Sequence, residues 1–321
     1  MWYEIPLAIL LLVVGMVLLI KGADFFVEGA SAVAKAMKIP SLVIGLTLVS
    51  VGTSMPEFSV SLQSSIKGLN DLSFGNVIGS NIFNVFAVIG VSAIFAPMVI
   101  SKMMQKYDIP ILLGVYLLLM LFAFLITPNI IEVWEAAILF SITIIYTIFL
   151  ILRSRNEMKN APAEEGKKRK WWLNLIFIVL GVAGIIFGGD LVVDNASILA
   201  KKLGMSDMLI GLTIVAVGTS LPELVTSVVA AKKGEKDIAI GNSIGSCLFN
   251  IVLILGFCSI ITPAVVENSS IVDVIVMLIS IVLLFLFTLR DKEVNRWQGV
   301  AMIIVYAFYL AFIILRNFYN F

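Results

Sequence analysis

An internal repeat constrains this chain more than any other feature of its sequence. Residues 41–90 align with residues 207–256 without a gap, at a constant offset of 166, and 23 of the 50 positions are identical. Both copies contain a V-G-T-S-x-P-E segment followed by a G-N-x-I-G-S segment. Soluble solenoids stack three or more short repeats, so a single long repeat indicates a different architecture, a chain made of two related halves.

Apolar stretches fill most of both halves. Hydrophobic residues make up 60% of the chain and charged residues 13%, about half of the roughly 25% usual in globular domains. A helix that spans a bilayer needs about 20 apolar residues. The sequence therefore predicts an all-α integral membrane protein with ten transmembrane helices, at about 5–22, 41–66, 72–98, 109–127, 131–152, 172–189, 207–231, 238–262, 271–289 and 298–316.

The ten spans divide into two five-helix repeats, residues 1–152 and 172–321, joined by a linker at 153–171. Because five is an odd number, the second half must enter the membrane upside down relative to the first. The matching residues Lys67 and Lys233 would then lie on opposite faces of the membrane. Inverted repeats are typical of secondary transporters, whose binding site lies near the bilayer midplane where the repeats meet.

Lysine and arginine residues predict the orientation, because they are retained on the cytoplasmic side. One set of connections holds 18 of the 22 basic residues, including the seven between Arg153 and Lys170. The other set holds Lys67, Lys201, Lys202 and Arg316. We therefore expect a multi-pass protein of the cell membrane, with both termini outside and a flexible cytoplasmic linker at 153–171.

Composition excludes several classes of protein. The net charge is +1, so the chain lacks the basic surface that nucleic-acid binding requires. It has no histidine, which removes imidazole metal ligands and Ser-His-Asp triads. Cys247 and Cys258 stand eleven residues apart in one apolar stretch, which is neither a disulfide framework nor a thiolate metal site. We expect a protein that is not an enzyme and has no cofactor. The lipid bilayer is its expected surroundings, and no protein partner is indicated.

Two acidic residues lie well inside predicted spans. Glu57 and Glu223 occupy the same place in the two copies of V-G-T-S-x-P-E. A carboxylate at the bilayer centre costs at least about 2.5 kcal/mol, and such residues generally mark transport or ion sites. The alternative is an acid satisfied by neighbouring hydroxyl groups for packing alone, and its recurrence in both halves argues against that alternative.

A proline precedes each acid and is expected to break the helix there. Pro56 has no N–H group and clashes with the carbonyl four residues earlier, so the backbone carbonyls near Ser50–Gly52 should be freed. Pro222 should act in the same way near Ala216–Gly218. Irregular backbone at membrane depth is tolerated only where it is buried or lines a cavity. Each break therefore brings carbonyl, carboxylate and hydroxyl oxygens together, the last from Thr53, Ser54, Thr219 and Ser220.

The following helices add further polar groups at matching positions. These are Ser80 and Asn84 in the first half and Ser246 and Asn250 in the second. Asn76 and Asn242 also match, and we expect them to join neighbouring helices by hydrogen bonds, as polar residues in membrane helices often do. Asp24 and Glu28, matched by Asp190 and Asp194, are expected to be interfacial acids with local partners.

A set of oxygens without sulfur or nitrogen favours hard cations such as Na⁺, Ca²⁺ or Mg²⁺. Two facing carboxylates repel each other in a low dielectric, so an empty site should take up cations or protons. One Ca²⁺ neutralises two ionised glutamates, and several Na⁺ ions would do the same. Mg²⁺ gives up its water reluctantly and suits a protein cage less well.

At these residues the chain resembles the cation/calcium exchanger superfamily. The two G-T-S-x-P-E segments, each followed by G-N-x-I-G-S, are similar to its α-repeats, and the chain looks most like the prokaryotic sodium/calcium exchangers. The resemblance implies ten helices, of which the second, third, seventh and eighth form a central ion site. It also implies that the long first and sixth helices move against this core to alternate access.

The resemblance further implies a set of ion ligands. Glu57 and Glu223 would be shared by Ca²⁺ and Na⁺. More oxygens would come from the side chains of Thr53, Ser54, Thr219 and Ser220 and from the backbone carbonyls of Ser50 and Ala216. Ser80 and Ser246 would complete flanking Na⁺ positions, and Asn84, with its counterpart Asn250, would lie beside the central one.

Two departures from related patterns matter for the coupling ion. Some prokaryotic members carry an aspartate where this chain has Asn250, and proton-coupled members carry an acid shortly after the G-N pair, where this chain has none. The leading hypothesis is therefore an antiporter that exchanges Na⁺ for Ca²⁺. The alternatives are a proton-coupled or other divalent-cation antiporter on the same scaffold, a cation channel, and an intramembrane hydrolase with paired carboxylates.

Overall fold

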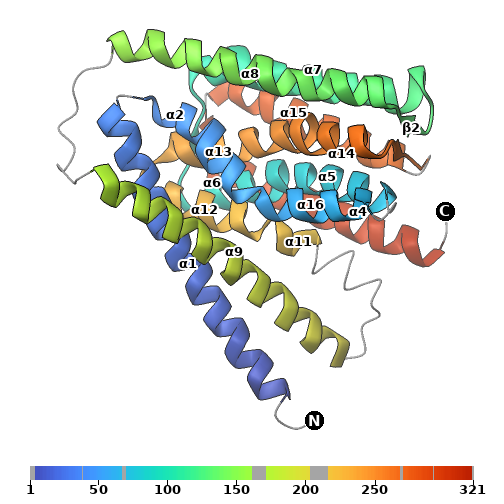
Figure 1. Cartoon of the computed structure of the whole chain (residues 1–321), viewed down its shortest axis with the longest axis horizontal. Helices are drawn as coiled ribbons and strands as arrows, with labels where there is room; N and C mark the ends of the chain where they lie inside the picture. The colour runs from blue at the N-terminus through green and yellow to red at the C-terminus, as the bar shows by residue number, and fades with distance from the viewer. Residues whose placement is uncertain are drawn as a thin grey trace.

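The structure, a computed structural model, describes residues 4–37, 39–66, 70–160, 171–202, 216–267, 270–291 and 293–319. Within these ranges the chain is almost entirely helical (Figure 1). Eight of its helical segments are long and apolar enough to cross a membrane, and a bent pair, Ser41–Thr53 with Met55–Ile66, brings the number to nine. The seventh predicted span, 207–231, begins outside the described residues, which contain its second part.

The sequence repeat is matched by repeated secondary structure. Six elements of the first half recur 166 residues later with the same bounds. The pairs are α3 (Ser50–Thr53) and α11 (Ala216–Thr219), α4 (Met55–Ile66) and α12 (Leu221–Lys232), α5 (Asn70–Phe83) and α13 (Lys236–Phe249), the π-helical segments η2 (Asn84–Ile89) and η6 (Asn250–Leu255), α6 (Gly90–Phe95) and α14 (Gly256–Ile261), and β1 (Met98–Val99) and β3 (Ala264–Val265). In the first half, α2 (Ser41–Ile44) and the π-helical η1 (Gly45–Val49) precede α3.

The remaining helices surround this repeated core. They are α1 (Glu4–Met37), the continuous run η3 (Met104–Asp108), α7 (Ile109–Leu121) and η4 (Phe122–Ile126), then α8 (Val133–Asn160), α9 (Trp171–Lys202), α15 (Ser270–Asp291) and α16 (Arg296–Tyr319). Side chains close the first turn of two of them. The backbone N–H of Glu132 donates to Glu135 Oε2 at the start of α8, and that of Asn295 donates to Gln298 Oε1 at the start of α16.

Two short antiparallel ladders are an exception to the all-α prediction. β1 pairs with β4 (Glu293–Val294), and β2 (Ile130–Ile131) pairs with β3. Each ladder joins a connection in one half of the chain to a connection in the other half. The strands are two residues long, so they fasten the ends of helices and do not form a separate layer.

The predicted linker begins too early. Helix α8 continues through Asn160, so the first eight residues of 153–171 are helical, and residues 161–170 lie outside the described ranges. Arg153, at the start of that stretch, is a buried side chain inside the bundle. An acid compensates its charge, so an arginine that looks like the start of a polar linker in the sequence can lie inside a packed helix.

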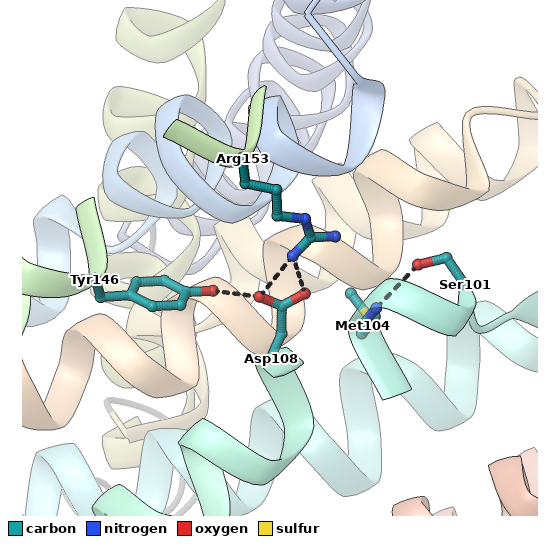
Figure 2. Close-up of polar contacts among 5 residues, drawn as sticks. All are labelled: Ser101, Met104, Asp108, Tyr146 and Arg153. Carbon is teal, nitrogen blue, oxygen red and sulfur yellow. Dashed lines mark hydrogen bonds and ion pairs between the residues drawn. The ribbon is translucent and has the colours of Figure 1, made fainter. Parts of the chain in front are cut away.

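Figure 2 shows the cluster that holds Arg153. Its Nη1 donates to Asp108 Oδ2 at 2.8 Å, and the Tyr146 hydroxyl donates to Asp108 Oδ1 at 3.0 Å. The second half contains the same trio at the matching helix ends, where Asp273 accepts from Tyr309 at 3.0 Å and from Arg316 Nη2 at 2.9 Å. The trios therefore tie the run of η3 and α7 to α8 in the first half and α15 to α16 in the second.

Helices α1 and α9 lie side by side and run obliquely to the other helices (Figure 1). Glycines bring their backbones into contact. A Cβ atom on Gly22 would lie 2.6 Å from the nitrogen of Ile185, and one on Gly181 would lie 2.6 Å from the nitrogen of Phe26. Real Cβ atoms essentially never approach backbone this closely, so these positions require glycine for the helices to pack at this distance.

Candidate functional site

The candidate site is built around two helix breaks with the same geometry. Ser54 separates α3 from α4 with φ −83° and ψ 11°, and Ser220 separates α11 from α12 with φ −93° and ψ 6°. Both residues lie two positions before the proline of their segment, and the helix axis bends by 45° at the first break. The predicted breaks at Pro56 and Pro222 are therefore present. They arise because neither proline can donate a hydrogen bond to the preceding turn.

The carbonyl of Ser50 is not freed, contrary to the prediction. It still accepts the helical hydrogen bond from the Ser54 N–H at 3.0 Å. The Ser246 hydroxyl, from the other half, also points at this carbonyl from 3.5 Å. The counterpart Ala216 begins α11. A carbonyl oxygen has two lone pairs, so Ser50 could accept a second ligand only in place of the long bond from Ser246.

The two carboxylates are fully buried and are held crosswise. The Ser54 hydroxyl donates to Glu223 Oε1 at 2.8 Å, and the Ser220 hydroxyl donates to Glu57 Oε1 at 2.8 Å. Each serine therefore serves the glutamate of the opposite half. Among the described residues, the second oxygen of each carboxylate, Oε2, has no hydrogen-bond partner. The structure thus brings together the two acids and two of the predicted hydroxyl groups.

Further predicted oxygens surround the carboxylates. Ser80 Oγ lies 3.1 Å from Ser220 Oγ, and Ser246 Oγ lies 3.5 Å from Glu223 Oε1. Thr53 is fully buried next to Ser54, and Thr219 is buried next to Ser220. The hydroxyl groups from all four central helices therefore face the same small region.

Asn84 and Asn250 begin the two π-helical segments η2 and η6. Both side chains are fully buried, and within the described residues neither amide has a hydrogen-bond partner on oxygen or nitrogen. Unpaired buried amides are costly, and these two recur at matching positions of the repeat, whereas the equally unpaired Asn81 is matched by Cys247. Asn84 and Asn250 therefore indicate a ligand or water that completes them. Sequence reasoning identified both residues but missed the π-helical turns, which leave no pattern in the side chains; such turns are frequent at functional sites.

Asn76 and Asn242 join helices, as predicted. Asn76 Nδ2 donates to the Ser61 hydroxyl at 3.0 Å, and Asn242 Nδ2 donates to the Ser227 hydroxyl at 2.9 Å. A bond that sequence reasoning missed runs from the Thr53 hydroxyl to Asn242 Oδ1 at 3.0 Å. It crosses from one half of the chain to the other, and no sequence pattern indicates it.

The acids at matching positions of the first and sixth predicted spans lie well inside the long helices α1 and α9. Asp24 has the local partner expected of it, Lys21, whose Nζ lies 3.8 Å from Asp24 Oδ2, and a distant partner, Lys233, whose Nζ lies 3.1 Å from Asp24 Oδ1. Asp190 and Asp194 are exposed on α9. In the part of the chain that the structure describes, no three acids or cysteines gather as a metal-binding cluster, and both cysteines are buried free thiols. A cation in the site would therefore rely on two carboxylates and neutral oxygens.

Two buried negative groups with one unpaired oxygen each form a site that requires positive charge. Ionised carboxylates in a low dielectric repel each other and lose their hydration, so the site must take up a cation or protons. Carboxylate, hydroxyl, amide and carbonyl oxygens are the ligands preferred by Ca²⁺ and by other hard cations. The arrangement is therefore suited to binding a desolvated cation between the two halves.

Comparisons with known proteins point to one family. The model of the sodium/calcium exchanger protein family matches residues 7–152 and 173–315, one stretch in each half. The sodium/calcium exchanger MaX1 of Methanosarcina acetivorans is 35% identical over 95% of this chain and 97% of its own length. The putative antiporter CaxA of Alkalimonas amylolytica is 36% identical over 94% and 97%.

A solved structure agrees with these matches. The sodium-calcium exchanger NCX_Mj, soaked with zero Na⁺ and Ca²⁺, superposes with a TM-score of 0.83 at 32% identity, covering 96% of this chain and 99% of the other. Together with the long apolar helices, the family match identifies a multi-pass membrane protein. The chain belongs to the sodium/calcium exchanger protein family.

Proposed function

We propose that this protein is a secondary active antiporter that exchanges Na⁺ for Ca²⁺ across the cell membrane by alternating access. The family match and the names of MaX1 and NCX_Mj support the class of ions. Glu57 and Glu223 are the shared ligands, and the surrounding neutral oxygens come from Ser50, Thr53, Ser54, Ser80, Asn84, Ala216, Thr219, Ser220, Ser246 and Asn250. No cofactor takes part, and the transported ions are the only occupants of the site.

The proposal includes ten transmembrane helices arranged as two inverted five-helix repeats. The six pairs of elements at a constant offset support the repeat. The strand ladders support the inversion, because β1 and β4 both belong to connections predicted as cytoplasmic, and β2 and β3 both belong to connections predicted as external. A topology without inversion would separate these partners by the thickness of the membrane.

The observation that carries the proposal is the crosswise pairing of Ser54 with Glu223 and of Ser220 with Glu57. It joins the acidic breaks of the two halves into one buried centre. Each carboxylate keeps one oxygen unpaired among the described residues, and that oxygen is available to a cation. One Ca²⁺ or several Na⁺ ions would neutralise the same two charges, so the two substrates compete, as exchange requires.

Flux in proteoliposomes tests the proposal. Purified protein is reconstituted, and ⁴⁵Ca²⁺ uptake is measured while Na⁺, K⁺ and H⁺ gradients are imposed one at a time. We expect uptake with an outward Na⁺ gradient alone, and its loss in Glu57→Gln and in Glu223→Gln. Uptake driven by a pH gradient without Na⁺ would establish the proton-coupled alternative. Undiminished uptake in either glutamine variant would exclude the site.

A further inference from the structure

The helical turn that carries each glutamate accepts hydrogen bonds from an asparagine of the neighbouring helix. Asn242 Nδ2, on α13, donates to the backbone carbonyl of Glu223 at 3.3 Å and to the Ser227 hydroxyl at 2.9 Å. Asn76 Nδ2, on α5, donates to the backbone carbonyl of Glu57 at 3.4 Å and to the Ser61 hydroxyl at 3.0 Å. The same two hydrogen bonds from one asparagine therefore occur in both halves, at matching residues.

The hydrogen bonds from Asn242 hold the helical turn that directly follows the break before Glu223. Pro222 precedes Glu223 and cannot donate a hydrogen bond to the turn before the break, so the turn that carries Glu223 is tied less firmly to α11. The two N–H groups of the Asn242 amide fix this turn against α13. They contact the carbonyl of the glutamate itself and the side chain one helical turn later.

The amide oxygen of Asn242 accepts a hydrogen bond from the other half of the chain. Its Oδ1 lies 3.0 Å from the Thr53 hydroxyl, which also lies 3.1 Å from the Val49 carbonyl and 3.4 Å from that of Ser50. A hydroxyl group has one proton and two lone pairs. When the proton points at Asn242 Oδ1, the nearest of these acceptors, the lone pairs of Thr53 are left for a cation.

We infer that Asn76 and Asn242 are positioning residues of the ion site, which set the placement of the glutamate turns without contacting the ion. The inference rests on the proposed function, because it assigns these residues to the affinity of the same site. Asn242 has the larger effect, since it orients Glu223 and Thr53 together. The chemical class of the ligand is a hard cation, Ca²⁺ or Na⁺.

The experiment compares Asn242→Leu and Asn76→Leu with the matched control Asn81→Leu. Asn81 is a buried asparagine of α5, like Asn242 in α13, but within the described residues its side chain has no hydrogen-bond partner. Two quantities are measured for each purified variant: the KM for Ca²⁺ in Na⁺-driven uptake, and the rise in melting temperature that 1 mM Ca²⁺ produces in detergent. Melting without ions reports the purely structural effect.

We expect the KM for Ca²⁺ to rise about tenfold in Asn242→Leu and several-fold in Asn76→Leu, because groups that orient metal ligands typically contribute at least this much to affinity. The rise in melting temperature on adding Ca²⁺ should be smaller than in the wild type. Asn81→Leu should keep the wild-type KM. Asn242→Ala removes the donors and the acceptor without adding a charge, so its KM should also rise; it carries the test if Asn242→Leu does not fold. An unchanged KM in the folded variants, with only a lower melting temperature, would show that the amides serve packing alone.

Failure of the proposed function gives a different result. If wild-type protein gains stability from Ca²⁺ but shows no Na⁺-driven uptake, antiport is wrong, and the change in the Ca²⁺-dependent melting shift still decides the role of the asparagines. Loss of that shift in Asn242→Leu, with retention in Asn81→Leu, would support positioning. A wild-type protein that neither transports nor binds Ca²⁺ would overturn both proposals.

Discussion

The serine hydroxyl groups at the helix breaks are the smallest features on which the site depends. Ser54 and Ser220 adopt nearly the same backbone angles, and each donates to the glutamate of the other half. Removing the Ser54 hydroxyl leaves the buried Glu223 Oε1 with only the long bond from Ser246, at 3.5 Å. A buried acceptor left in this way costs more than the loss of an average hydrogen bond, because its desolvation is no longer offset.

We therefore expect Ser54→Ala to lower the stability of the ion-free protein by about 1–3 kcal/mol. Its melting temperature in detergent is the measurement. Ser92→Ala is the matched control, since Ser92 is also a buried hydroxyl but has no hydrogen-bond partner within the described residues. The control should be neutral or slightly stabilising, and equal melting of the two variants would contradict the role assigned to Ser54.

Sequence reasoning singled out the two glutamates and the serines that the structure brings together, but not their pairing. Two intramembrane acids in a duplicated motif are conspicuous, so Glu57 and Glu223 were predictable from cost alone. Which serine donates to which acid depends on how the two halves pack, and nothing in the local sequence specifies it. The bond between Thr53 and Asn242 is hidden for the same reason, since 189 residues separate its ends.

At the scale of elements, two kinds of contact hold the peripheral helices together. Glycines bring α1 and α9 into backbone contact, and a Tyr-Asp-Arg trio joins the run of η3 and α7 to α8 and another joins α15 to α16. Asp24 adds a tie between α1 and the turn after α12 through Lys233. If α1 and α9 move during transport, as the resemblance implies, this ion pair must break or move with them.

Gly181→Ala tests the close packing of α1 on α9. The new Cβ would lie 2.6 Å from the backbone nitrogen of Phe26, so the helices must separate. Overpacking of this kind typically costs about 1–3 kcal/mol, which should appear as a lower melting temperature. Gly114→Ala in α7 is the control, because no described atom lies within 4 Å of the added carbon. A control that is equally destabilised would show that glycine has no packing role at position 181.

Arg153→Met tests the trio of the first half. It leaves Asp108 buried and without its cation, and breaking a buried ion pair from one side costs about 3–5 kcal/mol. Replacing both partners, as in Asp108→Leu with Arg153→Met, should restore most of the loss, because two apolar side chains avoid the uncompensated charge. Melting of both variants decides the point, and a double variant no more stable than the single one would refute this account of the trio.

The predicted start of the linker, at residue 153, is wrong because α8 continues through Asn160. Arg153 begins an 18-residue polar stretch in the sequence, which resembles a flexible connection. Its partner, Asp108, is 45 residues earlier, so local composition does not reveal that the arginine is paired and buried. The equal bounds of the repeated elements, in contrast, follow directly from the gapless alignment of 41–90 with 207–256.

At the scale of the whole molecule, the account requires the two halves to cross the membrane in opposite directions. Lys102 and Lys202 are exposed and lie on opposite faces in the proposed orientation. We expect a membrane-impermeant maleimide applied outside intact cells to label Lys202→Cys and not Lys102→Cys. Lysed cells should allow labelling of both. The native thiols Cys247 and Cys258 are buried and should give little background. Labelling of Lys102→Cys in intact cells would contradict the orientation.

The central claim is that both glutamates belong to one shared cation site. Calcium binding by purified wild-type protein, Glu57→Gln, Glu223→Gln and the double variant, measured by isothermal titration calorimetry in Na⁺-free buffer, tests it most directly. A shared site predicts that each single variant loses Ca²⁺ binding as completely as the double variant. Two single variants that each retain binding, with loss only in the double variant, would mean that the glutamates form separate sites and would contradict the account.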